Sequence, residues 1–157
     1  MPLVLSMLND SHYPILRRET EEIVVSLRAD GIVHVFIKAH THITIEVQER
    51  MLAAYKEITL VNRPFVFEPG EFTSISKEAR NNAQFMEDSS PVSASAVVIN
   101  NLGQRIIADY YYRFNRPKRP LAIFKSMDAA VEWLKKQELK PENKQAPPLG
   151  EGRNKHK

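Results

Sequence analysis

The sequence predicts an α/β fold: a mostly parallel sheet with an N-terminal antiparallel hairpin and helices packed on it. Three observations support this prediction. A strand-like run rich in β-branched residues, 92–99, is followed by an amphipathic stretch, 102–114, and by a second apolar run, 121–124. Further upstream, two β-branched runs meet at an Asp-Gly pair. Between these features, short apolar runs alternate with stretches of helical period.

The strand–helix–strand unit at 92–124 is the centre of this prediction. Two asparagines end its first strand and can cap the helix that follows. The apolar stripe of this helix recurs at four-residue spacing and consists of Leu102, Ile106, Tyr110 and Phe114. Pro117 and Pro120 end the helix. A unit of this length implies two parallel strands joined by a right-handed crossover.

The hairpin is predicted from the runs 23–27 and 32–37, which are joined through Asp30 and Gly31. Glycine accepts the positive φ that a tight turn requires. The residues before it, 1–19, form an N-terminal extension in which Leu3 to Leu8 pack on the body or mediate association and Asn9 to Pro14 form a loop.

The remaining elements alternate along the chain. Thr44 caps a helix whose inward face consists of Val47, Met51, Ala54, Tyr55 and Ile58. A short strand, 65–67, precedes a helix that starts near Ser74 or Ser76 and directs Ala79, Ala83 and Met86 inward. Ser126 caps a last helix, 128–136. The predicted order is therefore ββαβαβαβα.

Composition limits the possible classes of protein. The chain has 157 residues, 43% of them hydrophobic, which is sufficient for one domain with a core. The absence of cysteine excludes disulfides, thiolate metal sites and a cysteine nucleophile. The first residues, MPLVLSML, have neither the charged leader of a signal peptide nor the length of a membrane span. We therefore expect a soluble cytoplasmic protein.

The positive charge is concentrated at the C-terminal end. From Lys140 onward there are five Lys or Arg and two Asp or Glu, which account for the whole net charge of +3. The rest of the chain is therefore electroneutral, and we expect no nucleic-acid partner. We predict three parts: the extension 1–19, a domain at 20–137 and a disordered basic tail at 138–157.

Several fragments resemble small bacterial STAS-like domains, the anti-sigma-factor-antagonist fold, which is related to the CRAL-TRIO fold of lipid carriers. These are the Asp-Gly hairpin, the fragment SISKEAR at 74–80, the run ADYYYRFNRP at 108–117, and Phe124 followed by AVEWL at 130–134. The resemblance covers about residues 20–137. It implies an α/β regulatory or protein-interaction module without enzymatic activity and without a cofactor.

STAS regulators carry a serine that a partner kinase phosphorylates at the start of the helix after the central strand. The corresponding loop here is EFTSIS at 71–76, with candidate hydroxyls at Thr73, Ser74 and Ser76, although no aspartate stands directly before the serine. The resemblance thus implies a phosphorylation or partner-contact loop. Each serine alternatively serves only as a helix cap.

Two further groups of residues are candidate sites. Arg113, Arg116, Lys118 and Arg119 cluster around a predicted turn and could contact an anion or an acidic partner, or form a solvated rim. His40 and His42 could share a metal ion, but no third ligand lies nearby, so we predict no metal. No Gly-rich phosphate loop, nucleophile elbow or acid pair is present, which points away from an enzyme.

The sequence leaves three classes of function open, the last of which is an enzyme without a recognisable motif. The first is a regulatory or interaction module that binds a protein partner. The alternative is a carrier of a small apolar or lipid-like ligand, which requires an apolar cavity. We also expect a homodimer, because a hairpin at the margin of a sheet exposes unpaired backbone groups.

Overall fold

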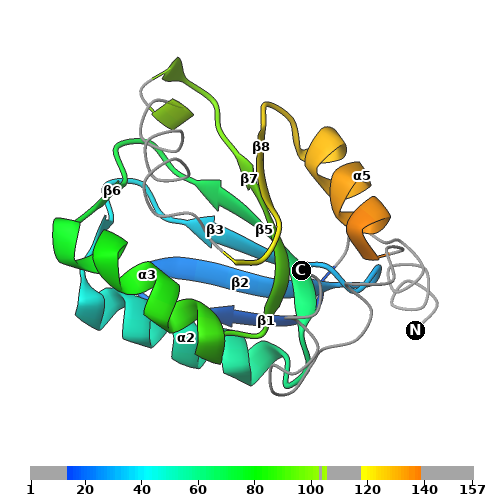
Figure 1. Cartoon of the computed structure of the whole chain (residues 1–157), viewed down its shortest axis with the longest axis horizontal. Helices are drawn as coiled ribbons and strands as arrows, with labels where there is room; N and C mark the ends of the chain where they lie inside the picture. The colour runs from blue at the N-terminus through cyan, green and yellow to red at the C-terminus, as the bar shows by residue number, and fades with distance from the viewer. Residues whose placement is uncertain (1–13, 103, 106–117, 139–157) are drawn as a thin grey trace.

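The computed structural model describes residues 14–102, 104, 105 and 118–138. Its main sheet has six strands in the order β1-β2-β3-β5-β7-β8 (Figure 1). β1, β2 and β3 pair antiparallel, whereas β3, β5, β7 and β8 pair parallel. The predicted α/β fold with a mostly parallel sheet and an antiparallel hairpin is confirmed. The strands are β1 Pro14–Glu19, β2 Ile23–Arg28, β3 Val33–Ile37, β5 Arg63–Pro69, β7 Val92–Val98 and β8 Leu121–Phe124.

Strand β1 was not predicted, because residues 14–19 were assigned to the N-terminal extension. Its side chains Arg17, Arg18 and Glu19 are exposed, and Leu16 is 50% exposed. Residues 16–19 of this edge strand are exposed and need no apolar alternation, so the sequence carries no strand pattern here. β1 also covers β2, so the β2–β3 hairpin does not lie at the margin of the sheet. The predicted homodimer loses that reason and stays a prediction.

The hairpin turn confirms the role assigned to Asp30 and Gly31. Gly31 has a φ of +87°, which disfavours any residue with a side chain. The Arg28 backbone N–H donates to the Ile32 carbonyl at 2.9 Å and closes the turn. The Asp30 carboxylate accepts hydrogen bonds from the Arg28 guanidinium and from the Ile32 N–H.

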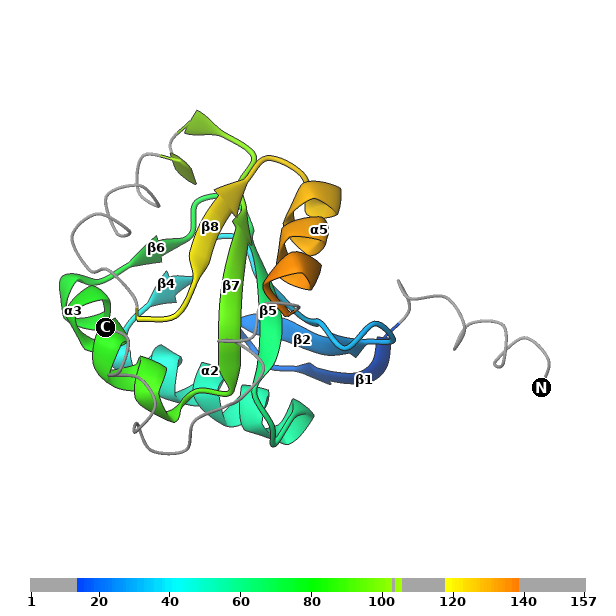
Figure 2. The same cartoon turned by 45° about the vertical axis from the view of Figure 1, so that its right-hand side comes forward.

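The helices lie on both faces of the sheet. α2 (Ile45–Ile58) and α3 (Lys77–Ser89) lie on one face and α5 (Met127–Glu138) lies on the other (Figure 2). The predicted caps are confirmed, because Thr44, Ser76 and Ser126 accept hydrogen bonds from N–H groups of the first turns. The helix predicted over 102–114 lies mostly outside the described residues.

Apolar side chains form one cluster on each face of the sheet. The larger cluster joins β2, β3 and β5 to α2 and includes Val25, Val35 and Phe65, all fully buried. The second joins β5 and β7 to α5 and includes Val66, Ala96 and Leu134. The alternation of side chains along β5 explains both, since Phe65 faces one cluster and Val66 the other.

α3 packs less closely than α2. Five residues of α2 are buried, whereas Ala79 is the one buried residue of α3, a helix that the structure describes throughout. Ala83 and Met86, which were expected to point inward, are half-buried. This difference in packing leaves space between α3 and the sheet.

Candidate functional site

Two loops meet at the carboxyl ends of β3 and β5. Their residues form a short parallel ladder, β4 (His42–Ile43) with β6 (Ser74–Ile75), in which His42 is opposite Ser74. The Ser74 N–H donates to the Thr41 carbonyl and the Ser76 N–H to the Ile43 carbonyl, both at 2.9 Å. This ladder was not predicted, because a two-residue strand has no periodic pattern.

Gly70 permits the close approach of these loops. Its N–H donates to the Ile37 carbonyl at 2.7 Å. A Cβ atom at position 70 would lie 2.7 Å from the backbone nitrogen of Ala39 and 2.8 Å from the Ile37 oxygen. Both neighbours are backbone atoms, so they cannot rotate away, and the position excludes any side chain.

Two aromatic side chains stack at this end of the sheet. The rings of His40 and Phe72 lie 5.1 Å apart with an interplanar angle of 17°. Both residues have positive φ, 67° and 60° respectively. Phe72 is nevertheless 73% exposed. Positive φ is unfavourable for a bulky residue, and such strain occurs often at functional sites.

Ser74 follows Phe72 by two positions in the same loop. Its Oγ and the His42 Nδ1 are hydrogen-bonded at 2.7 Å, and both residues are exposed. We call the group His40, His42, Phe72 and Ser74 the loop surface.

The three predicted hydroxyls have different environments. Ser76 caps α3, because its Oγ accepts a hydrogen bond from the Ala79 N–H at 3.0 Å. Thr73 donates to the Gly70 carbonyl at 3.2 Å. Both residues are half-buried, whereas Ser74 is exposed. Ser74 is therefore the most accessible of the three and is not a helix cap.

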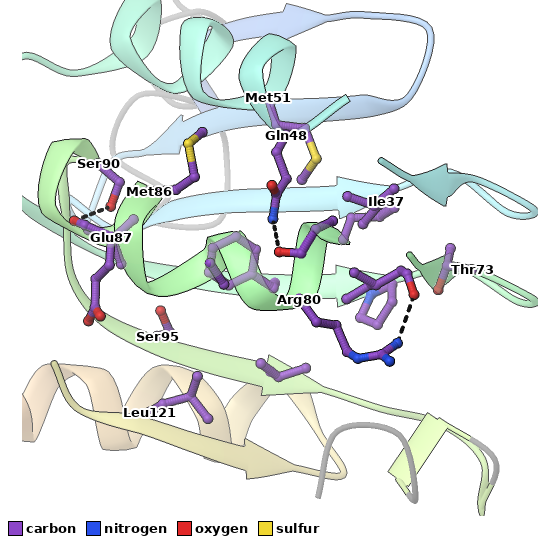
Figure 3. Close-up of a pocket in the computed structure, with 18 of the residues that line it drawn as sticks. Ile37, Gln48, Met51, Thr73, Arg80, Met86, Glu87, Ser90, Ser95 and Leu121 are labelled. Atoms are coloured by element: carbon purple, nitrogen blue, oxygen red, sulfur yellow. Dashed lines mark hydrogen bonds between the residues drawn. The ribbon is translucent and has the colours of Figure 1, made fainter. Parts of the chain in front are cut away.

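An apolar cavity of about 340 Å³ lies between α2, α3 and the sheet (Figure 3). Met51 from α2 and Met86 from α3 line it, with Leu121 of β8 on the opposite side in Figure 3. Side chains alternate between the two faces along β7, so Ser95 and Val97 both line this cavity. Ile99, which comes directly after the strand, lines it as well. Thr73, Ser74 and Ile75 also line it, so the loop after β5 forms part of its wall.

Several polar groups of this cavity bind other parts of the protein. Gln48 of α2 donates to the Ala79 carbonyl of α3 at 2.8 Å, as Figure 3 shows. Arg80 donates to the Ile75 carbonyl at 3.0 Å, and Gln104 donates to the Gly70 carbonyl at 3.0 Å. These bonds connect the helices and loops around the cavity.

Tyr55 of α2 also lines the cavity and is only 7% exposed. Its ring lies edge-on to the rings of Phe65 and Phe67, with centroid distances of 5.1 Å and 6.3 Å respectively. Its hydroxyl has no hydrogen-bond partner among the residues that the structure describes. Burial raises the pKa of this phenol, so the hydroxyl stays protonated and can donate. The helical pattern predicts Tyr55 as a core residue, and the only sequence signal for another role is its phenol in a stripe of otherwise apolar side chains.

The predicted basic cluster is only partly described, since Arg113 and Arg116 lie outside the described residues. Arg119 donates to the carbonyls of Ser90 and Val92, and Lys118 pairs with Asp88 at 3.3 Å. The backbone N–H groups of Lys118 and Arg119 donate to the Glu87 carboxylate. Lys118 and Arg119 therefore connect the segment before β8 to the C-terminal end of α3. Positive charges are favourable there because they interact with the negative end of the helix dipole.

The described part of the chain also bears on metal binding, on His34 and on membrane spans. Within it, no group of three His, Asp or Glu side chains could hold a metal ion. His34 is half-buried on the central strand β3 and is hydrogen-bonded to Glu68 at 2.9 Å. No helix in the described ranges is long and apolar enough to cross a membrane.

A family model described as a domain of unknown function, DUF7793, matches residues 25–138. The chain belongs to this family. Among solved structures, the chain is similar to an uncharacterised protein of the DUF3478 family with a SpoIIAA-like fold from Shewanella loihica PV-4. The two are 12% identical with a TM-score of 0.48, over 76% of this chain and 90% of that one. The comparison with curated proteins gives no match.

Proposed function

We propose that this DUF7793 domain is a non-enzymatic interaction module that binds a protein partner through the loop surface. The observation that carries the proposal is Phe72, which remains 73% exposed although its backbone is held at a φ of 60°. An exposed aromatic ring in a fixed orientation offers a partner a large contact area at little entropic cost.

Ser74 supplies a means of regulating this contact. Its hydroxyl is exposed, and the neighbouring imidazole of His42 lies within hydrogen-bond distance. A phosphate on Ser74 would add close to two negative charges beside Phe72 and next to the N-terminal end of α3. Such a charge changes what a partner meets without requiring the fold to change.

The test uses photo-crosslinking in the source cell, with a photoreactive residue at position 72 or at position 85. Phe85 is a matched control, because it is also 73% exposed but lies within α3. A partner that crosslinks from position 72 and not from position 85 is then purified, and its affinity for three chains is measured: wild type, Phe72→Asn and Phe85→Asn.

Asparagine at position 72 removes the ring but tolerates positive φ better than phenylalanine does. We expect Phe72→Asn to weaken the partner at least about ten-fold and to melt no lower than wild type, while Phe85→Asn binds normally. Equal binding by all three chains would disprove the proposal.

The cavity favours the second candidate function, a carrier of a small apolar ligand. The cavity volume of about 340 Å³ lies in the lower range for small-molecule sites. The walls of the cavity are largely aliphatic and aromatic. Native mass spectrometry of the full chain purified from its source would detect a retained ligand as a defined added mass that is lost on denaturation.

A further inference from the structure

The position of Tyr55 is fixed by its neighbours. Its ring is held edge-on against Phe65 and Phe67, with interplanar angles of 72° and 65°. Phe65 is fully buried in the centre of the sheet. A phenol ring held in this way has little freedom to move, and Tyr55 is one of the residues that line the cavity.

This hydroxyl differs from four other polar side chains around the cavity. Gln48, Arg80, Thr73 and Arg119 all donate to backbone carbonyls. The Tyr55 hydroxyl has no such partner within the described ranges, although Tyr55 is only 7% exposed to solvent. Buried hydroxyls are normally hydrogen-bonded, and one left alone is unfavourable.

We propose that the cavity binds a small, uncharged, largely apolar molecule whose oxygen accepts a hydrogen bond from the Tyr55 hydroxyl. This inference rests on the carrier function proposed above and defines its ligand class. The phenol offers one donor, which suits a carbonyl or ether oxygen. A carboxylate would lose more hydration on entry than one phenol can replace. The aliphatic walls accommodate the remainder of the molecule.

Two probes of nearly equal shape test the hydrogen bond. One is a naphthyl methyl ketone, which has an acceptor oxygen, and the other is ethylnaphthalene, which has none. Binding of each to the full chain is measured by fluorescence titration, for wild type and for Tyr55→Phe. The variant keeps the ring and its aromatic contacts and removes only the hydroxyl.

We expect the ketone to bind wild type roughly three- to ten-fold more tightly than the hydrocarbon, the range for one hydrogen bond. Tyr55→Phe should abolish this difference by weakening the ketone alone, and the unliganded variant should melt at the wild-type temperature or above. Ala83→Phe, which adds a ring to the cavity wall, should weaken both probes.

Three results would overturn the inference. If both probes bind equally and Tyr55→Phe changes neither, the carrier function stands but the phenol is no anchor. If Tyr55→Phe melts clearly below wild type without ligand, the hydroxyl already has a partner, such as an internal water. If neither probe binds at its solubility limit, the carrier function and the inference both fail.

Discussion

Arg50 of α2 donates a hydrogen bond of 2.6 Å to the carboxylate of Glu22, which lies just before β2. The Glu22 side chain is 11% exposed, whereas that of Arg50 is 54% exposed. The Thr20 hydroxyl oxygen accepts the Glu22 N–H at 3.2 Å. The pair thus connects the β1–β2 turn to the helix that covers the sheet, and it couples this contact to pH.

Stability should decrease in acid partly through Glu22. The hydrogen bond from Arg50 holds the pKa of Glu22 below its ordinary value of 4.5, although burial opposes the shift. A depressed pKa means that the unfolded chain binds this proton more readily. The contribution of Glu22 to the free energy of unfolding is therefore complete at pH values above its ordinary pKa. It is lost as the pH falls through the lower pKa that Glu22 has in the folded protein. Lys38 lowers the pKa of Glu19 in the same direction.

Urea unfolding between about pH 7 and pH 3 measures this effect. Glu22→Gln should reduce stability at neutral pH and flatten the decline in acid. Glu132→Gln is the control, since Glu132 lies on the exposed side of α5. A wild-type slope in the Glu22 variant would contradict the assigned role.

Asp30 joins the hairpin turn to α5. Its side chain, 9% exposed, accepts hydrogen bonds from Arg28 and Ile32, and Lys135 of α5 lies 3.7 Å away. Asp30→Asn should lower the free energy of unfolding by about 2 kcal/mol, because it leaves the nearly buried Arg28 without its counter-charge. The exposed Asp128→Asn should change it by about 0.5 kcal/mol or less. Equal effects in chemical denaturation would show that Asp30 is no more than a surface charge.

Alanine should be tolerated differently at two glycines. At Gly31 the φ of +87° makes alanine strained, but the nearest atom, Nη1 of Arg63, lies 3.4 Å away and can move, so the cost should be about 1 kcal/mol. At Gly70 the new methyl meets backbone atoms at 2.7 and 2.8 Å. Gly70→Ala should therefore be the more destabilising and should shift the amide NMR signals of Ala39 and Phe72. The reverse order would mean that the loops can separate freely.

Substitutions at Ser74 and at Ser76 should have different effects, because only Ser76 caps α3. Ser76→Ala removes the α3 cap and should cost about 1 kcal/mol, whereas Ser74→Ala should leave stability almost unchanged. Ser74→Asp should fold normally and alter affinity for the crosslinked partner, although one carboxylate carries less charge than a phosphate. Mass spectrometry of the native protein should find phosphate on Ser74. Wild-type affinity in both Ser74 variants, with no phosphate on the native chain, would leave this position without a regulatory role.

Local signals in the sequence predicted the elements that depend on nearby residues. Gly31 and Asp30 predicted the hairpin, because the turn requires a positive φ and a short polar side chain within four residues. Thr44 and Ser126 predicted helix starts through bonds to residues three positions ahead. Ser74 and Ser76 were left open as alternatives, because both hydroxyls precede the helix and only the fold decides which one turns toward Ala79.

The sequence by itself thus determined the α/β class, the hairpin and the caps, since backbone preference and apolar period are local properties. The tertiary structure alone decided the remaining features. β1 is held by pairing with β2, and His42 meets Ser74 across 32 positions of sequence. The cavity is lined by Ala79 and Ala83 of α3 together with residues of strands far away in the chain. Tyr55 belongs to the core and also lines this cavity. This position depends on how α2 and α3 pack on the sheet, which no local sequence pattern encodes.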